Sequence, residues 1–359
     1  MKNTSKILAY ILVLAFLFAG CGGEKGTADS TKDAGGDKLV ENPSFTDPLQ
    51  FRKGTQEAYC PVCKKAVEWM GLTQAYVDTI SITDNAGEII DSAIMSETVF
   101  ESGHYYLTED LTYHDSPVMG FFRGPGKGKT SCLHLNDHNI TTPATTCIFG
   151  NSGVLNVMGN GIVTGYSPNQ TEGAAVRNGN RNANNGVNLY GGTYKKTDQT
   201  LPNGPVVAFD GAGRCVSVYE GVVIDGGDGI AVFAESSAKR EKEGCLELIG
   251  CTVIGDVKIA NLDMYPNIIT VKDAQIKGSF TVPAGHTMTL SGKVQISQLV
   301  LGEDMRLNAK ELGAESQIGI DATGIFTAKL ESAADYLAYF TPTGSNREIT
   351  VAEDMLQCN

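Results

Sequence analysis

Apolar residues return at regular intervals along most of this chain, and within each interval they alternate with polar residues. An aliphatic anchor residue is preceded by a second aliphatic residue two positions earlier and followed by an apolar residue five positions later. The anchors are Leu135, Val157, Leu189, Val218, Leu248 and Val271; the earlier partners are Leu133, Leu155, Val187, Val216, Leu246 and Ile269; the later partners are Ile140, Ile162, Tyr194, Val223, Val253 and Ile276. Alternation with a period of two predicts a β-strand with one buried face at each anchor.

The residues directly before the anchors are all polar or hydroxylic, which predicts that they form an outer face. They are His134, Asn156, Asn188, Ser217, Glu247 and Thr270. The anchors are separated by roughly 20 to 30 residues, a repeat length typical of solenoids. A β-sandwich does not require the same inward positions in every repeat, and a β-propeller needs about 40 residues per blade. The pattern therefore predicts an all-β fold, namely a parallel β-helix in which each coil buries the aliphatic residues of the next.

The first 20 residues have the composition of an export signal. Lys2 and Lys6 precede an apolar stretch, Ile7–Phe18, that is too short to span a bilayer comfortably. The stretch ends in Phe18-Ala19-Gly20-Cys21, which resembles the bacterial lipobox, although Leu usually stands where this chain has Phe18. The resemblance implies that Cys21 carries lipid and anchors an extracytoplasmic protein to the cell membrane. An ordinary secretory signal followed by a chance cysteine is the alternative.

The composition of the chain changes after the signal. Residues 21–50 are rich in Gly, Asp, Lys, Ser and Thr and show no periodicity, so we expect a lipidated, disordered linker. We expect a small cap that contains a Cys-Pro-Val-Cys motif at 51–100, the β-helix at 101–345 and a C-terminal segment at 346–359.

Glycine and charge narrow the function classes. The 42 glycines favour tight turns over a helical bundle. The formal charge is −13 for the whole chain, and it becomes −15 (26 minus 41) once the signal with Lys2 and Lys6 is removed. A protein that binds nucleic acid by neutralising phosphates is therefore excluded.

Three segments of the body resemble a known superfamily. They are Gly103–Asp110 (GHYYLTED), Cys132–Thr141 (CLHLNDHNIT) and Gly153–Val157 (GVLNV). They are similar to segments of bacterial surface and secreted proteins of the pectin-lyase-like superfamily, and the similarity runs from Tyr59 to the C-terminus. The resemblance implies a right-handed parallel β-helix. It implies little about activity, because many such proteins have no assigned one.

The Cys60-Pro61-Val62-Cys63 motif is the candidate for metal binding, because such a turn presents two thiolates to one ion. Glycine commonly stands where this chain has Lys64, since it eases the left-handed turn behind the second thiolate. Cys132 and His104 lie near the N-terminal end of the predicted β-helix. We expect a structural zinc site made of four residues, with His134 as a substitute ligand: Cys60, Cys63, Cys132 and His104. A Cys60–Cys63 disulfide or free thiols remain equally open.

Two further cysteines, Cys215 and Cys245, hold the same position three residues before consecutive anchors. Adjacent strands lie about 4.8 Å apart, a separation that a disulfide tolerates. The pair forms either a disulfide between coils or a ladder of free thiols, and the in-register geometry slightly favours the ladder. Of the nine cysteines, eight follow Cys21, and their pairing does not follow from the sequence.

An enzymatic interpretation centres on Gly226-Gly227-Asp228-Gly229-Ile230-Ala231, which resembles a segment of polygalacturonases. Gly227 replaces the first of two carboxylates that glycoside hydrolysis requires, and only Asp228 matches. A hydrolase or lyase would assemble further charged residues around Asp228: Asp225, Asp210, Arg214 and Arg177. Asp-Gly-Gly and Asp-Gly are also ordinary turn sequences, and we favour a turn.

A binding interpretation rests on Tyr190 and Tyr219, which directly follow consecutive anchors and are expected to face outward. Stacked tyrosines present flat faces to sugar rings, and neighbouring polar side chains supply hydrogen bonds: Asn156, Asn188 and Glu247. The simpler interpretation is that the tyrosines only cover the sheet.

The sequence thus predicts a membrane-anchored, extracytoplasmic β-helix protein that binds polysaccharide without catalysis, as an adhesion or binding module of the cell surface. A polysaccharide lyase or glycoside hydrolase is the first alternative, and a passive structural protein of the cell envelope is the second. The polysaccharide rests on the resemblance to carbohydrate-active β-helices.

Overall fold

The structure of the protein is a computed structural model. It describes residues 43–80, 102–113, 122–123, 125, 128–143, 146–150, 153–179, 185–210, 214–235, 244–261, 266–302, 306–322, 326–330, 337–343, 348–352 and 355–358. The chain divides into two compact units, residues 1–38 and residues 39–359, and every described residue belongs to the second unit. The predicted signal and the lipidated Cys21 lie outside the described residues, as does most of the predicted linker.

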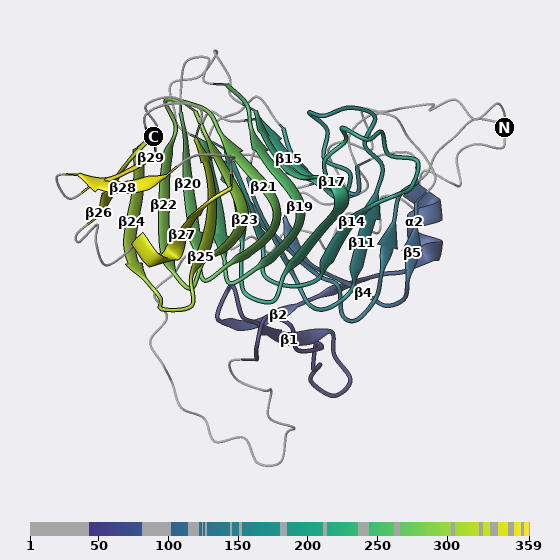
Figure 1. Cartoon of the computed structure of the whole chain (residues 1–359). Helices are drawn as coiled ribbons and strands as arrows, with labels where there is room; N and C mark the ends of the chain where they lie inside the picture. The colour runs from purple at the N-terminus through teal and green to yellow at the C-terminus, as the bar shows by residue number, and fades with distance from the viewer. Residues whose placement is uncertain are drawn as a thin grey trace, which may run out of the picture. The chain divides into compact units, whose positions relative to one another are not determined.

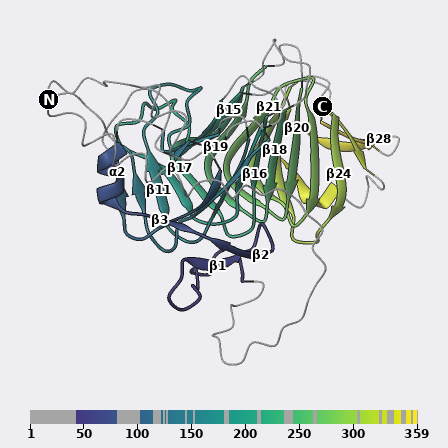
Figure 2. The same ribbon diagram turned by 180° about the vertical axis from the view of Figure 1, so that it is seen from behind.

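The fold is all-β, and most of its strands belong to two long, mainly parallel sheets (Figures 1 and 2). The first sheet contains β3 (Met70–Leu72), β4 (Gly103–Leu107), β7 (Thr130–His134), β10 (Val154–Met158), β13 (Asn185–Leu189), β16 (Arg214–Val218), β18 (Gly244–Ile249), β20 (Asn267–Lys272), β22 (Thr287–Gly292), β24 (Arg306–Leu312), β26 (Phe326–Leu330), β29 (Met355–Cys358) and β28 (Ile349–Ala352). The second sheet contains β5 (Leu111–Thr112), β8 (Ile140–Thr141), β11 (Ile162–Gly165), β14 (Thr193–Lys196), β17 (Val223–Glu235), β19 (Thr252–Ile259), β21 (Gln275–Val282), β23 (Gln295–Leu301), β25 (Gln317–Ala322) and β27 (Phe340–Pro342).

A shorter row of strands joins the second sheet through β17. It contains β6 (Phe122–Arg123), β9 (Ile148–Gly150), β12 (Val176–Asn178) and β15 (Val207–Asp210). Along the chain, strands of the two sheets follow one another, and from β3 to β27 each strand pairs in parallel with its counterpart in a neighbouring repeat. The predicted all-β class and the parallel pairing between repeats are therefore confirmed. This coiled arrangement is what a solenoid requires, because each coil completes the core of its neighbours.

The anchor residues form a continuous buried column inside the stack. All of them have no exposed surface: Leu135, Val157, Leu189, Val218, Leu248 and Val271. Leu189 pairs with Val157 on one side and with Val218 on the other, as the repeat predicts. At the first step the register differs, because Val157 pairs with Leu133 and not with Leu135.

Two of the predicted later partners are off by one residue. Ile162 is 39% exposed, and the buried residue that pairs with Ile140 is Val163. In the same way Val223 is only half-buried, and Ile224 is the residue that enters the core. In both coils the turn after the anchor contains one additional residue, which shifts the alternation that follows.

The outer face of the first sheet is covered near its N-terminal end. The covering element is an antiparallel hairpin of β1 (Glu57–Cys60) and β2 (Lys65–Glu68), followed by Trp69, which is 2% exposed. Trp69 belongs to a small apolar cluster with Cys132 and Met158 from the sheet. Two predicted outward residues, His134 and Asn156, are therefore buried, and Ser217 farther along the sheet is buried as well.

Residues 43–50 also lie on this face, although the sequence places them in the disordered linker. The Gly159 amide donates to the Phe45 carbonyl at 2.7 Å, and the Leu49 amide donates to Asn136 Oδ1 at 3.1 Å. Phe45 and Leu49 pack against the cluster around Trp69. The packed part of the chain thus begins before residue 50, because these apolar side chains find a surface that only the folded sheet provides.

The two ends of the first sheet differ. At one end β3 already pairs in parallel with β4, so the stack begins inside the predicted cap region. At the other end β29 pairs antiparallel with both β26 and β28, so parallel pairing in this sheet ends at β26 and the predicted C-terminal segment contributes antiparallel strands. The helices among the described residues are α2 (Gln74–Ile80) and the 3₁₀ turn η2 (Leu337–Tyr339). Within that part of the chain no helix has the length and apolar character needed to cross a membrane.

Candidate metal centre

Three sulfur atoms and one imidazole nitrogen meet between the hairpin and the first sheet. The ligand atoms of four residues all lie within 4.8 Å of one another: Cys60, Cys63, His104 and Cys132. The Cys60 and Cys132 sulfurs are 3.9 Å apart, and the Cys63 sulfur is 3.1 Å from His104 Nε2. A tetrahedral ion with zinc–sulfur bonds of about 2.3 Å would hold its sulfurs about 3.8 Å apart. The cluster therefore has the size to hold one metal ion.

The hairpin supplies two of the sulfurs through a tight turn. Cys60 ends β1, and the Lys64 amide donates to the Cys60 carbonyl at 2.8 Å. The Cys63 amide points to the Cys60 sulfur at 3.4 Å, so the backbone stabilises a thiolate there. Lys64 has a φ of 54°, the left-handed conformation that glycine usually adopts behind such a pair. Lys64 thus adopts the left-handed conformation of the turn, although its side chain was expected to hinder it.

The sheet supplies the other two ligands. His104 on β4 and Cys132 on β7 are directly paired on neighbouring parallel strands, which places both side chains on the outer face. The edge of the Trp69 ring contacts the His104 ring, with centroids 5.1 Å apart. A bound ion would join the hairpin to two successive coils of the stack.

The electrostatics of the cluster favour thiolates. The hydrogen bond with Cys132 lowers the pKa of Cys60 to about 4 and that of Cys63 to about 6, against the cost of burial. Burial opposes protonation of His104, but hydrogen bonds to the Cys60 and Cys63 sulfurs raise its pKa. The same shared hydrogen bonds raise the pKa of Cys132. A cation at the centre would take the place of the shared proton.

The composition of the site limits its chemistry. Four protein ligands fill a tetrahedral shell, whereas catalytic zinc sites keep one position for water or substrate. Three thiolates select zinc or another thiophilic ion over calcium or magnesium. The arrangement is suited to hold structure together and not to activate a substrate.

His134 does not belong to this cluster. Its Nδ1 accepts a hydrogen bond from the Asn136 amide at 3.0 Å, and burial lowers its pKa to about 4. The expected role as a substitute ligand is therefore wrong, because the ring is already used to hold the turn after β7. Cys60 and Cys63 are not joined by a disulfide, so that alternative is not observed either.

Cys215 and Cys245 form a disulfide between neighbouring strands β16 and β18. Their Cα atoms lie 4.5 Å apart, which is within the range that disulfides span. The preference for a ladder of free thiols was wrong, because direct parallel pairing brings the two side chains close enough to bond. Cys147 and Cys251 are buried free thiols.

The two tyrosines stack as expected, but Tyr190 does not offer an open face. The rings of Tyr190 and Tyr219 are parallel, with centroids 4.5 Å apart. Phe45 stacks on the other side of Tyr190, with a centroid distance of 4.3 Å. Both faces of Tyr190 are therefore occupied by protein, and the sequence could not reveal this because Phe45 precedes it by 145 residues.

The polar residues expected around the tyrosines form a row along the outer face of the first sheet. Asn188 Nδ2 donates to Asn156 Oδ1 at 2.9 Å, and Ser217 Oγ donates to Glu247 Oε2 at 2.6 Å. Asn156 is only 2% exposed and points its amide at the Ser131 carbonyl. At the buried end of this row the polar groups bond to one another, while Glu247 at the other end lies on β18, one strand past the strands that precede the tyrosines.

The segment around Asp228 lies within β17 and forms a bulge, because the register with β19 shifts between Asp225 and Ile230; the favoured turn between strands is therefore not observed. Gly227 has a φ of 59°, and its amide donates to Asp225 Oδ1 at 3.1 Å. Asp225 also pairs with Lys195 at 3.5 Å, and Asp228 is exposed. Arg177 pairs instead with Glu172 at 3.3 Å. The side chains of Asp210 and Arg214 lie outside the description, and the described charged groups do not form a catalytic set.

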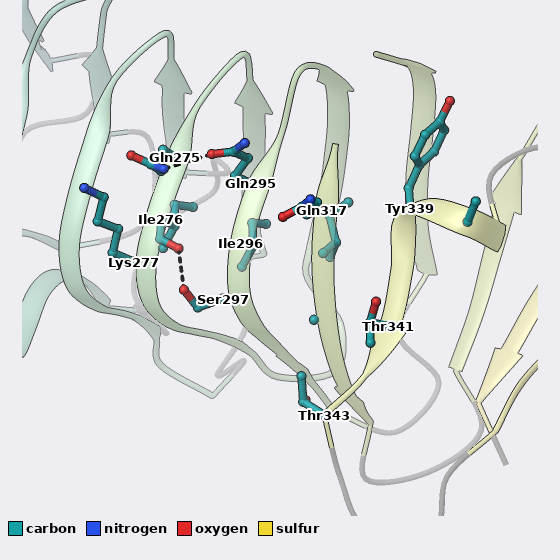
Figure 3. A pocket seen from close by; sticks show the side chains of 13 residues that line it. Gln275, Ile276, Lys277, Gln295, Ile296, Ser297, Gln317, Tyr339, Thr341 and Thr343 are labelled. Carbon is teal, nitrogen blue, oxygen red and sulfur yellow. Dashed lines mark hydrogen bonds between the residues drawn. The ribbon is translucent and has the colours of Figure 1, made fainter. Parts of the chain in front are cut away.

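The sequence analysis missed a groove on the outer face of the second sheet. The groove has a volume of about 500 Å³ and contains three glutamines, Gln275, Gln295 and Gln317, from successive coils (Figure 3). The sequence contains a pattern that could have predicted this row, because each glutamine directly precedes an inward isoleucine. Gln275 lies in the coil of the last anchor, Val271, and Gln295 and Gln317 lie in the two coils after it, beyond the anchors on which the repeat was defined.

A comparison with known proteins found no family model, no curated protein and no solved structure that matches this chain.

Proposed function

We propose that the protein is an extracytoplasmic, lipid-anchored, right-handed parallel β-helix that binds polysaccharide without catalysing a reaction. The observation that carries this proposal is the alignment of hydrogen-bonding side chains across successive coils. One such row runs through Asn188, Ser217 and Glu247 on the first sheet, and another runs through three glutamines on the second. Rows of this kind suit an extended polymer, because each coil repeats the same polar group along one line.

We also propose that one Zn²⁺ ion, held by Cys60, Cys63, His104 and Cys132, fixes the hairpin to the N-terminal end of the stack. The two thiolates of the turn and the two ligands of the sheet complete a tetrahedral set. Because no ligand position remains for substrate, the ion serves stability. This role supports a binding protein over a metal-dependent lyase or hydrolase.

The test is a glycan array probed with the full chain, with product formation measured on every glycan that binds. Binding without turnover is the expected result. Turnover that disappears in Asp228→Ala would show that the exposed carboxylate is catalytic and would replace the binding function with a hydrolase or lyase. An array without any bound glycan would leave the passive structural role.

A further inference from the structure

Amide side chains replace β-branched ones along a single row of the second sheet. Gln275, Gln295 and Gln317 pair directly across β21, β23 and β25, and Tyr339 lies beside Gln317 in the next coil. In the earlier coils the same row holds Ile162, Thr193, Val223 and Thr252. The change from aliphatic and hydroxyl groups to three amides occurs where the groove begins.

The groove lies between this row and a second outward row. The second row begins with Lys277 on β21 and continues with Ser297, Gly319 and Thr341, whose side chains are small (Figure 3). A Cβ atom at Gly319 would collide with the Ser297 carbonyl oxygen and would lie 2.6 Å from Thr343 Cγ2. Because Gly319 has no side chain, the bottom of the groove stays open at this position, while the Tyr339 ring lies at the C-terminal end of the groove.

The polar groups of the groove are suited to hydroxyl groups. Gln275 Nε2 donates to Gln295 Oε1 at 2.8 Å, which orients the Gln295 amide and leaves its nitrogen as a donor. Within the described part of the chain, the exposed side-chain amide of Gln317 forms no hydrogen bond, so it offers both a donor and an acceptor. Vicinal hydroxyls of a pyranose ring match such donor and acceptor pairs, and a tyrosine ring packs against the carbon face of a sugar.

Charge narrows the class of ligand that the groove would take. Among the described residues that line it, Lys277 at the edge is the one that carries a charge. None of the described lining residues has a carboxylate, so these residues do not favour a cation, and a single exposed lysine does not balance a polyanion. The lining therefore favours an uncharged ligand.

We propose that this groove binds a short segment of a neutral polysaccharide, laid across β21, β23, β25 and β27. The inference rests on the proposed polysaccharide binding and names the site and the class of sugar. It moves the site from the stacked tyrosines of the first sheet to the amide row of the second.

Calorimetric titration of the full chain with neutral hexasaccharides of glucose, xylose and mannose tests this inference. Gln317→Ala removes one donor and one acceptor from an exposed position and is expected to weaken binding about tenfold. Ser297→Tyr fills the floor and is expected to abolish binding. Gln298→Ala is the matched control, because its amide lies on the same strand but bonds to Asp321 at 3.3 Å, away from the lining. Thermal melts of all variants report folding.

The outcomes separate the site from the function. Unchanged affinity in both groove variants, with loss in Tyr219→Ala, would place the site on the first sheet; it would overturn this inference and leave the proposed function standing. Binding of oligogalacturonate alone, lost in Lys277→Ala, would overturn the neutral class. A wild-type protein that binds no glycan would overturn both.

Discussion

Cys132 shows how much depends on one side chain in this protein. It is fully buried, it contacts the hairpin through the Cys60 sulfur, and Asn156 approaches it from the next strand. A serine at this position keeps the size of the side chain but does not supply a thiolate. The neighbouring ligands would then hold an ion with three groups in place of four.

We therefore expect Cys132→Ser to lose Co²⁺ affinity by at least about 100-fold, since even the loss of an outer partner costs about 10- to 100-fold. The intense sulfur-to-cobalt absorption of the wild type should fade with it. Cys251→Ala is the matched control: this thiol is also buried, and burial raises its pKa to about 12, but it lies outside the cluster. Equal cobalt spectra for Cys132→Ser and the wild type would exclude the cluster as a metal site.

The acidity of the cluster predicts how metal affinity depends on pH. Above pH 6 the Cys60 and Cys63 groups, with pKa values of about 4 and 6, are already thiolates. Cys132, whose pKa is raised, keeps its proton until an ion displaces it. Affinity should therefore rise with pH between 6 and 8 as at least one proton is released, and it should fall more steeply below 6, where Cys63 also holds a proton.

Competition with a chromophoric chelator at several pH values, together with proton release in weak buffer, measures this dependence. A metal affinity that stays constant from pH 5 to 8 would contradict the thiolate assignment.

At the scale of elements, the alternation of apolar residues revealed the strands because it depends only on neighbours along the chain. Alternation alone did not predict the pairing register, because one additional residue in the turns before Val163 and Ile224 changes which of the following side chains face inward. The covering of Asn156 and Tyr190 was not predictable, because the hairpin and Phe45 reach them across long stretches of sequence. The four candidate ligands were found because a tight cysteine turn and two residues of early coils were considered together.

The disulfide between β16 and β18 joins two elements whose cysteines are 30 residues apart in sequence. Cys215→Ser combined with Cys245→Ser should lower the free energy of unfolding by about 2–4 kcal/mol, because the unfolded chain regains the freedom of that loop. Denaturant titration measures the change. The double variant should match the reduced wild type, and a double variant as stable as the oxidised wild type would contradict the expected role of the bond.

At the scale of the whole molecule, the two ends of the first sheet have different strand pairing. The first sheet closes with antiparallel strands β29 and β28, which interrupt the parallel pattern that a further coil would continue. The parallel pattern therefore stops at β26 and does not continue to this edge of the sheet, where β28 is the outermost strand. At the opposite edge β3 is outermost, and the hairpin covers the adjoining outer face.

The predicted anchor belongs to this scale as well. Cys21→Ser should remove the lipid, so the full chain should move from the membrane fraction to the soluble fraction when cells are fractionated. Labelling with a radioactive fatty acid should disappear in the same variant, while the stability of the folded body stays unchanged. Cys358→Ser is the control for cysteine loss. Persistent membrane association and labelling of Cys21→Ser would exclude the lipobox.

The attachment of residues 43–50 and the hairpin has a mechanical consequence. A pulling force applied to the chain ahead of residue 43 first loads the hydrogen bond between Phe45 and Gly159 and the ring stack on Tyr190. The next load-bearing contacts are those between the cysteine turn and the sheet, and only then do the coils bear tension. If an ion fills the cluster, its sulfur bonds can yield and re-form. The contacts of the N-terminal segment would then break and re-form under force before the coils unfold.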